Sequence, residues 1–266
     1  MTPQELIERV ARAMADLPEL KALFVGGSYG SGMADAYSDV DLIALAEPAD
    51  IAGLAARWRP VLEGIAPIVY WNEFGSGAIV LNAVTEDWLR CDMLIVAPAS
   101  FTGRARTEVR PLIDRIGHFE ALPATVPPRT PDPRRVLKMV NEFIRILGLL
   151  PVAVGRGEHF MAATGTGMLR DLLMKLMLEE VPHPTGGALH PSRVLPAADM
   201  AILNALPFPG PERRAVIDAH FAIARAFFPR ARAVSARIGM AWPEPFEAAT
   251  REHLRRIFAS ESDVSW

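Results

Sequence analysis

The sequence predicts an α/β fold in its first half, with a mixed sheet of about five strands and flanking helices, followed by a C-terminal all-α helical domain. Three observations support this division. Helix and strand patterns alternate up to about residue 98, a proline-rich stretch follows, and beyond it the apolar residues recur with the period of a helix. With 266 residues, half of them hydrophobic, the chain is long enough for two domains that each bury a core.

The elements of the first half follow from their apolar spacing. A first helix is predicted over 3–17, with Leu6, Val10 and Met14 on one face, and a second over 50–65. Strands are predicted by the short apolar runs at 21–27, 40–46, 67–73, 77–85 and 88–98. The run at 40–46 is apolar on both faces after its aspartate, as expected for a central strand covered on both sides.

The second half begins after a stretch with five prolines, Leu122–Pro133, which has neither a helical nor a strand period. We therefore predict a domain at 1–121, a linker at 122–133 and a helical domain at 134–266. Asp132 as N-cap and Pro133 at the first helical position start the first helix of that domain. Further helices are predicted over 168–181, 210–228, 229–240 and 243–260, because Pro229 starts a new helix or kinks the old one.

Charge and cysteine content exclude several classes of protein. The formal net charge is −3, which argues against a dedicated nucleic-acid binder. The charge is uneven, since residues 1–131 sum to −6 and residues 132–266 to +3. Cys91 is the only cysteine, so neither an intrachain disulfide nor a cysteine-based zinc cluster can form. With no basic-then-apolar leader and no apolar run of about 18 residues, a cytoplasmic location and no membrane partner are expected.

Two aspartates stand at the start of the strand predicted over 40–46. Asp39 and Asp41 are two residues apart, so on a strand both carboxylates project to the same side, with their Cα atoms roughly 7 Å apart. Two such acids repel each other unless a cation lies between them, and carboxylates at this spacing suit a hard divalent cation such as Mg²⁺. The sequence therefore predicts a metal site at this strand end.

A glycine turn and a third acid complete the predicted site. Gly27 permits close approach of a ligand to the backbone, and Ser28 is expected to cap a short helix whose free N–H groups face an anion. Asp92, near the start of an apolar strand, is expected to complete the metal site or to take a proton. The alternative for Asp92 is a structural carboxylate in a salt bridge with Arg90.

These residues carry a resemblance to a known family. The stretch "GGSYGSGMADAYSDVDL" resembles the signature of the DNA polymerase β-type nucleotidyltransferase superfamily: a glycine–serine pair, a gap of about ten residues, Asp-x-Asp on a strand, and a later carboxylate on a neighbouring strand. It is most similar to the antibiotic-modifying branch, the aminoglycoside and lincosamide adenylyltransferases, and to the minimal nucleotidyltransferases. The resemblance covers about residues 21–98, and the helical second half resembles the antibiotic enzymes more loosely.

The resemblance implies a role for each residue. Gly27 and Ser28 would hold the β- and γ-phosphates of a nucleoside triphosphate. Asp39 and Asp41 would bind Mg²⁺, and Asp92 would be the third metal ligand or the base for the acceptor hydroxyl. The co-substrate implied is ATP or another nucleoside triphosphate, and the partner is a small hydroxyl-bearing acceptor. A DNA or tRNA end is disfavoured by the charge.

One departure concerns the loop after the serine. Many relatives carry an arginine there, where this chain has Tyr29, Gly30 and Ser31. A basic residue of the helical domain is expected to substitute, with Lys138 and Arg145 as the first candidates. Glu142, on the same helix, is an alternative general base, although an ordinary surface ion pair with Lys138 is the simpler interpretation.

The resemblance thus predicts an adenylyltransferase that moves AMP onto a hydroxyl and releases pyrophosphate. The acidic first half is compatible with a polycationic aminoglycoside acceptor, whereas the basic second half leaves open a less charged, lincosamide-like antibiotic or another metabolite. Antibiotic resistance is the biological role that this branch implies. A different class stays open: a non-catalytic nucleotide sensor or antitoxin-like protein of the same fold, or an enzyme that transfers AMP to a protein hydroxyl.

Overall fold

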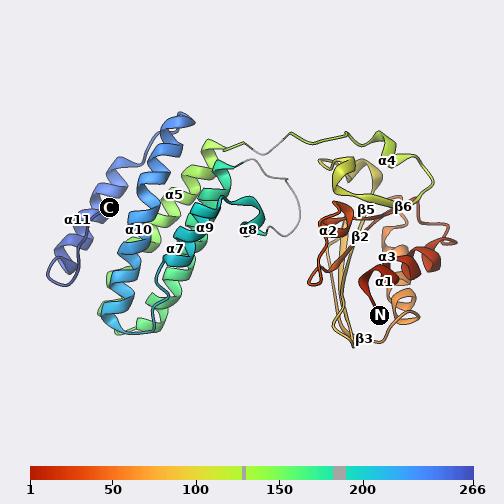
Figure 1. Cartoon of the computed structure of the whole chain (residues 1–266), viewed down its shortest axis with the longest axis horizontal. Helices are drawn as coiled ribbons and strands as arrows, with labels where there is room; N and C mark the ends of the chain where they lie inside the picture. Colours follow the sequence, from red (N-terminus) through yellow and green to blue (C-terminus); the bar gives the residue numbers. More distant parts are fainter. Residues whose placement is uncertain (128–129, 182–189) are drawn as a thin grey trace. The chain divides into compact units, whose positions relative to one another are not determined.

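The computed structural model describes residues 1–127, 130–181 and 190–266, so two residues of the predicted linker, 128 and 129, lie outside it. The chain divides into two units (Figure 1). Unit 1 is Met1–Pro127, and unit 2 comprises the described residues of 130–181 and 190–266. In the described residues, no helix is both long enough and apolar enough to cross a membrane.

Unit 1 contains a six-stranded sheet in the order β3-β4-β5-β2-β1-β6. Only the β2–β5 pair is parallel, so the sheet is mixed, as predicted. The strands are β1 (Ala22–Val25), β2 (Val40–Leu45), β3 (Ile68–Phe74), β4 (Ile79–Thr85), β5 (Arg90–Val96) and β6 (Arg110–Asp114). The helical segments are α1 (Pro3–Met14), α2 (Gly27–Gly30), α3 (Ile51–Glu63), η1 (Pro98–Ser100), η2 (Arg106–Glu108) and α4 (His118–Ala121).

One face of the sheet is covered by two helices, and the other is only partly covered. Helices α1 and α3 lie on the first, where Leu6, Met14 and Trp58 pack against buried strand residues such as Leu42 and Met93 (Figure 1). The second face carries a smaller cluster whose members include the buried side chains Phe24, Ile43, Leu45, Val96, Phe101 and Leu122. Since side chains alternate along a strand, Asp41 and Asp92 project to this second face with Ile43, Leu45 and Val96.

The sixth strand is a difference from the sequence prediction. Strand β6 pairs antiparallel with β1 at one edge of the sheet, whereas about five strands were predicted. It is short, mostly exposed or half-buried, and contains Pro111, which cannot donate a backbone hydrogen bond. An edge strand tolerates these features, but they remove the apolar pattern by which a strand is recognised in a sequence.

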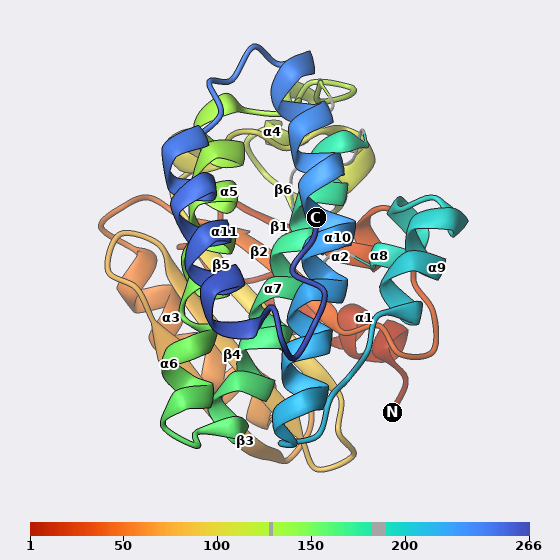
Figure 2. The same ribbon diagram turned by 90° about the vertical axis from the view of Figure 1, so that its left-hand side faces the viewer.

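Unit 2 is built from helices, as predicted. They are α5 (Pro133–Gly148), α6 (Leu150–Gly155), α7 (His159–Glu180), α8 (Pro191–Val194), α9 (Ala197–Ala205), α10 (Arg213–Arg237) and α11 (Glu244–Phe258). Figure 2 shows α10 beside α7 and α11 beside α5. As predicted, Asp132 is the N-cap of α5 and Pro133 lies at its start.

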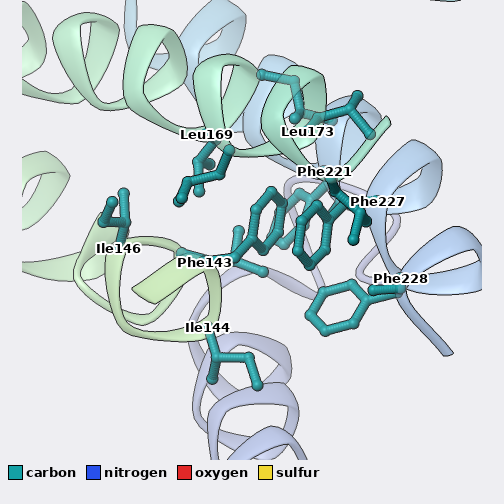
Figure 3. Close-up of a cluster of buried hydrophobic side chains, with 14 of the residues drawn as sticks. Phe143, Ile144, Ile146, Leu169, Leu173, Phe221, Phe227 and Phe228 are labelled. Carbon is teal, nitrogen blue, oxygen red and sulfur yellow. The ribbon is translucent and has the colours of Figure 1, made fainter. Parts of the chain in front are cut away.

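Aromatic side chains fill the core of unit 2 (Figure 3). Phe143 of α5 stacks on Phe227 of α10 with ring centroids 3.7 Å apart, and Phe228 meets Phe143 edge-on at 5.5 Å. All three rings are buried, so they join the two helices by apolar contact and by favourable ring geometry. This core belongs to unit 2 alone and is separate from the two clusters of unit 1.

Pro229 does not start a new helix. Helix α10 runs through it from Arg213 to Arg237, so the predicted separate helices at 210–228 and 229–240 are one element. An interior proline removes one backbone hydrogen bond and strains the preceding turn. Here Phe227, Phe228 and Ala231 are buried on either side of it, and this burial holds both halves in one helix.

Candidate functional site

The glycine turn lies directly against the second strand. After β1 the backbone N–H of Gly26 donates to the carbonyl of Asp41, at 2.8 Å. Helix α2 then begins at Gly27, with Gly26 as its N-cap and no side-chain capping hydrogen bond. The predicted capping role of Ser28 is therefore wrong, because the helix has already begun before that residue.

Gly27 and the carboxylate of Asp41 are in close contact. Gly27 has a φ of 54°, which only glycine adopts without strain, and a Cβ built on it would lie 1.9 Å from Asp41 Oδ2. No residue with a side chain fits there while the carboxylate keeps its place. The turn and the acid, which are 14 positions apart in the sequence, therefore form one local site.

The carboxylates of Asp41 and Asp92 are neighbours across the parallel pair. Asp41 of β2 and Asp92 of β5 are register partners, and adjacent strands lie about 4.8 Å apart. Burial raises the pKa of Asp41 to about 6, the negative charges of Asp39 and Asp92 add to this rise, and Arg104 and Arg90 oppose it. The structure thus brings together the three predicted acids closely enough that their charges act on one another.

Asp39 lies one residue before β2 and is engaged by an arginine. Arg90 Nη2 lies 3.2 Å from Asp39 Oδ2 and 3.4 Å from the carbonyl oxygen of Tyr37, to which it donates. Arg90 was considered as a salt-bridge partner of Asp92, and that alternative is wrong. In the described part of the chain, Asp92 has no ion pair.

The three carboxylates suit a hard cation chemically, but their side chains are not already arranged around one position. Carboxylate oxygens are the ligands that Mg²⁺ prefers, and a cation would favour the charged form of Asp41, whose pKa burial raises first and the neighbouring acids raise further. As the side chains lie, residues 1–127, 130–181 and 190–266 contain no group of three or more His, Cys, Asp or Glu that could hold a metal. Asp41 and Asp92 share a face in register, and Asp39 would have to leave Arg90 to join them. The metal-ligand assignment stays a prediction.

A polar row across the sheet was missed by the sequence analysis. Asn72 of β3 is the register partner of Asn82 of β4, which faces Asp92 of β5, which faces Asp41 of β2. Four strands therefore place an amide or a carboxylate in one line on the partly covered face. Each of the four strands contains a polar residue in the sequence, but β3, β4 and β5 contain further polar residues as well, so the line is recognised only through the register.

Aromatic side chains flank this row on β3. Tyr70 and Phe74 lie on either side of Asn72 along the strand, and each side chain is 52% exposed. Their register partners Val84 and Val80 are half-buried. The face beside the carboxylates therefore combines exposed aromatic rings and half-buried valines with amides.

The candidates on α5 belong to unit 2. Arg145 donates two hydrogen bonds to Glu142, at 2.7 and 2.6 Å, and these bonds lower the pKa of Glu142. The expected ion pair with Lys138 is thus made with Arg145 instead. A cavity of about 510 Å³ is lined by Arg134, Leu137, Lys138, Asn141, Glu142, Arg145 and Phe246. A carboxylate with a lowered pKa is a weaker base, which does not favour Glu142 as the general base.

No family model matches the chain, and no curated protein matches it. Among solved structures, it is similar to an aminoglycoside 6-adenyltransferase from Bacillus subtilis, at 13% identity and a TM-score of 0.44, over 95% of this chain and 97% of the other. A nucleotidyltransferase-like protein from Exiguobacterium sibiricum matches at 14% identity and a TM-score of 0.39, over 97% and 90%. An apo CCA-adding enzyme matches at 12% and 0.36, over 96% and 70%.

Proposed function

We propose that this protein is a magnesium-dependent nucleotidyltransferase that moves AMP from ATP onto a hydroxyl of a small acceptor and releases pyrophosphate. The observation that supports it best is the contact between Gly27 and the Asp41 carboxylate, with Asp92 in register beside it. A half-buried, repelling pair of acids destabilises a fold, so its presence against a glycine turn is typical of a site built for a cation and an anion.

In the proposed reaction, Gly27 and Ser28 would hold the β- and γ-phosphates. Asp41 and Asp92 would hold Mg²⁺, together with Asp39 if it leaves Arg90. When bound, Mg²⁺ would neutralise phosphate charge and lower the pKa of the acceptor hydroxyl. The acceptor oxygen forms a bond to the α-phosphorus, the bond from that phosphorus to the bridging oxygen breaks, and pyrophosphate leaves. Asp92 is the group of unit 1 assigned to accept the hydroxyl proton, and alignment of the reactants contributes much of the remaining rate.

The acceptor is proposed to be an antibiotic of the aminoglycoside or lincosamide kind. The face next to the carboxylates carries Tyr70 and Phe74 with the amides of Asn72 and Asn82, so it favours an acceptor with an apolar ring and few charges. The lincosamide-like acceptor therefore fits this face better than a polycation does. A cytoplasmic location is part of the proposal, since ATP is supplied there.

The test is pyrophosphate release from ATP and Mg²⁺ in the presence of a panel of aminoglycosides and lincosamides, with the labelled product identified by mass spectrometry. We expect one acceptor to become heavier by about 329 Da, because an adenylyl group has replaced a hydrogen. Asp41→Asn should abolish it. No transfer to any acceptor, with nucleotide binding that does not depend on Mg²⁺, would overturn the proposal.

One observation favours the alternative, a non-catalytic nucleotide-binding protein. Asp39 is held by Arg90, and an arginine in that position can substitute for a metal ion. If the alternative holds, Arg90→Ala should weaken nucleotide binding without producing turnover. If the protein is an enzyme, Arg90→Ala frees Asp39 and should lower the Mg²⁺ concentration needed for half-maximal activity. Incubation of labelled ATP with lysate proteins tests for transfer of AMP to a protein hydroxyl.

A further inference from the structure

Strand β3 forms one edge of the six-stranded sheet, and its outer side has no partner strand in the described residues. The strand pairs only with β4, so the backbone N–H and C=O groups that point away from β4 are available to another strand. The one irregularity of the β3–β4 pair lies between Ile68 and Tyr70, and the register from Tyr70 to Phe74 is regular. Five consecutive residues therefore form a regular, open edge.

The two edges of the sheet differ in their protection against pairing. The opposite edge, β6, carries the exposed Arg110 and Pro111, and a charge and a proline both discourage a further strand. Strand β3 contains neither proline nor lysine, and Glu73 is its only charged residue. Tyr70 and Phe74 are each 52% exposed. An apolar edge of this kind is a template for strand addition.

The regular part of β3 is complementary to a second copy of itself. When two identical edges pair antiparallel about a two-fold axis, one residue faces its own copy. The middle of the regular part is Asn72. With Asn72 on the axis, Tyr70 of each copy is opposite Phe74 of the other, and Trp71 is opposite Glu73. Aromatic residues directly opposite each other stabilise a sheet, and this register contains two such pairs.

Charge complementarity supports the same register. The guanidinium carbon of Arg59, on α3, lies 5.5 Å from the centroid of the Trp71 ring. Arg59 donates to Glu63 through Nε, which leaves its terminal nitrogens for another acceptor. Glu73 is exposed and has no ion pair in the part of the chain that the structure describes. Because Trp71 is opposite Glu73 of the second copy, each Arg59 is brought beside an unpaired carboxylate.

The neighbouring registers are less favourable. With Glu73 on the axis, two like charges would stand directly opposite each other, which destabilises a sheet. With Trp71 on the axis, Phe74 would be opposite Ile68, where the strand is irregular, and Glu73 would be opposite the apolar Val69. The register centred on Asn72 avoids both defects.

We propose that two copies of this chain pair through β3 in a two-fold symmetric dimer, with Asn72 on the axis and their sheets joined into one. Residues directly opposite each other project to the same face, so the polar row runs from Asp92 through Asn82 and Asn72 into the second copy. Each copy places Phe74 beside Tyr70 of the other, on the face that carries the carboxylates. The inference does not depend on the proposed function.

The first test is sedimentation velocity of the full chain over a concentration series that reaches the high micromolar range. The wild type should form a dimer. Glu73→Arg and Arg59→Glu should each raise the Kd of the dimer by about 10-fold or more, since each substitution acts twice in a symmetric dimer. The double variant Arg59→Glu/Glu73→Arg restores opposite charges and should return to within about threefold of the wild type. The matched control is Arg110→Glu on β6, which should leave the Kd unchanged.

The second test is disulfide cross-linking, which reports the register. Cys91, the only native cysteine, is buried. Asn72→Cys places two thiols directly opposite each other, with Cα atoms about 4.5–5.5 Å apart, which is within the range of a disulfide. Glu73→Cys is the control, because its copy lies diagonally across at about 7–8 Å. After mild oxidation, only Asn72→Cys should give a dimer on a non-reducing gel.

Several results would overturn the inference. These are a wild type that is monomeric at every concentration, a dimer that Glu73→Arg does not weaken, and a double variant that does not recover. Equal cross-linking of Asn72→Cys and Glu73→Cys would exclude the register. Assembly beyond a dimer would also contradict it, since pairing uses the open edge of both copies. None of these results bears on pyrophosphate release, which tests the proposed function separately.

Discussion

At the scale of single residues, the contact between Gly27 and Asp41 is the most constrained feature of the candidate site. The position requires both a positive φ and the absence of a Cβ. Gly32 shares the first requirement but not the second, since its φ is 72° and a Cβ there would meet nothing within 4 Å. A comparison of substitutions at Gly27 and Gly32 therefore separates the cost of backbone strain from the cost of steric overlap.

Gly27→Ala should displace the Asp41 carboxylate and destabilise unit 1. We expect Gly32→Ala to cost about 1 kcal/mol from backbone strain, and Gly27→Ala about 3 kcal/mol because steric overlap adds to that strain. If Asp41 acts in the proposed reaction, its displacement by about 1 Å should reduce pyrophosphate release about 100-fold in Gly27→Ala only. Urea unfolding and turnover measure the two effects. Equal costs in both variants would contradict the close contact.

Asp41 should make stability depend on pH in the metal-free protein. Burial and the neighbouring acids raise its pKa from 3.8 to about 6, so the folded state binds more protons than the unfolded state between these values. Stability contributed by the protonated carboxyl is therefore lost as the pH rises from about 4 through 6. Asp41→Asn should be more stable than wild type above pH 6, by on the order of 1 kcal/mol after allowance for solvent screening.

The measurement is the free energy of unfolding of wild type and Asp41→Asn from pH 4 to pH 7.5, with a chelator present. The difference between the two proteins should grow across this range up to about pH 6 and then stay constant. If the difference in the free energy of unfolding between the two proteins is the same at every pH, Asp41 does not titrate as described. Excess Mg²⁺ should stabilise the wild type more than Asp41→Asn if the acid is a metal ligand.

The sequence identified Gly27, Asp39, Asp41 and Asp92 because glycine and acidic residues stand out in apolar surroundings. It did not identify Asn72 and Asn82, since their line with the acids forms only through the register of the strands. Likewise, the pairing of Arg90 with Asp39 depends on which carboxylate the side chain reaches. Side-chain contacts between distant segments are not encoded in local spacing.

At the scale of elements, periodicity predicted the strongly apolar strands and helices and failed where burial is weak. Strand β6 was missed because it is half-exposed and contains Pro111. Helix α10 was divided at Pro229, since local preference disfavours an interior proline, yet the buried aromatic residues on either side keep the helix continuous. In both elements the tertiary contacts decided the outcome against the local preference.

Pro229→Ala tests how much strain α10 carries. The exposed proline lacks the N–H that would bond one turn back, so alanine should restore that hydrogen bond and the intrinsic helix preference. We expect a gain of about 1–2 kcal/mol, less than the full propensity difference because alanine also frees the unfolded chain. The control is Pro133→Ala at the start of α5, where no backbone hydrogen bond is lost and a change within about 0.5 kcal/mol is expected. Thermal unfolding measures both, and a loss of stability in Pro229→Ala would contradict the account.

At the scale of the whole molecule, the chain has two units with separate cores. The buried residues of unit 1 form two clusters on the two faces of its sheet, and those of unit 2 form one cluster among its helices. The acids and the glycine turn lie in unit 1, whereas Glu142, Lys138 and Arg145 lie in unit 2. A substitution in one core is therefore expected to act first on the unit that contains it.

Calorimetry of two core variants tests this independence. Phe227→Leu removes the ring that stacks on Phe143, and Phe24→Leu removes the ring that stacks on Phe101. Each change should destabilise its own unit by about 1–3 kcal/mol, because the smaller side chain leaves a cavity and loses ring contacts. If ATP with Mg²⁺ binds to unit 1, it should raise the melting temperature of the transition that Phe24→Leu lowers and leave the transition lowered by Phe227→Leu in place. If ATP with Mg²⁺ shifts only the transition that Phe227→Leu lowers, nucleotide binding belongs to the helices of unit 2. If each variant shows a single unfolding transition that shifts as a whole, the two units do not unfold independently.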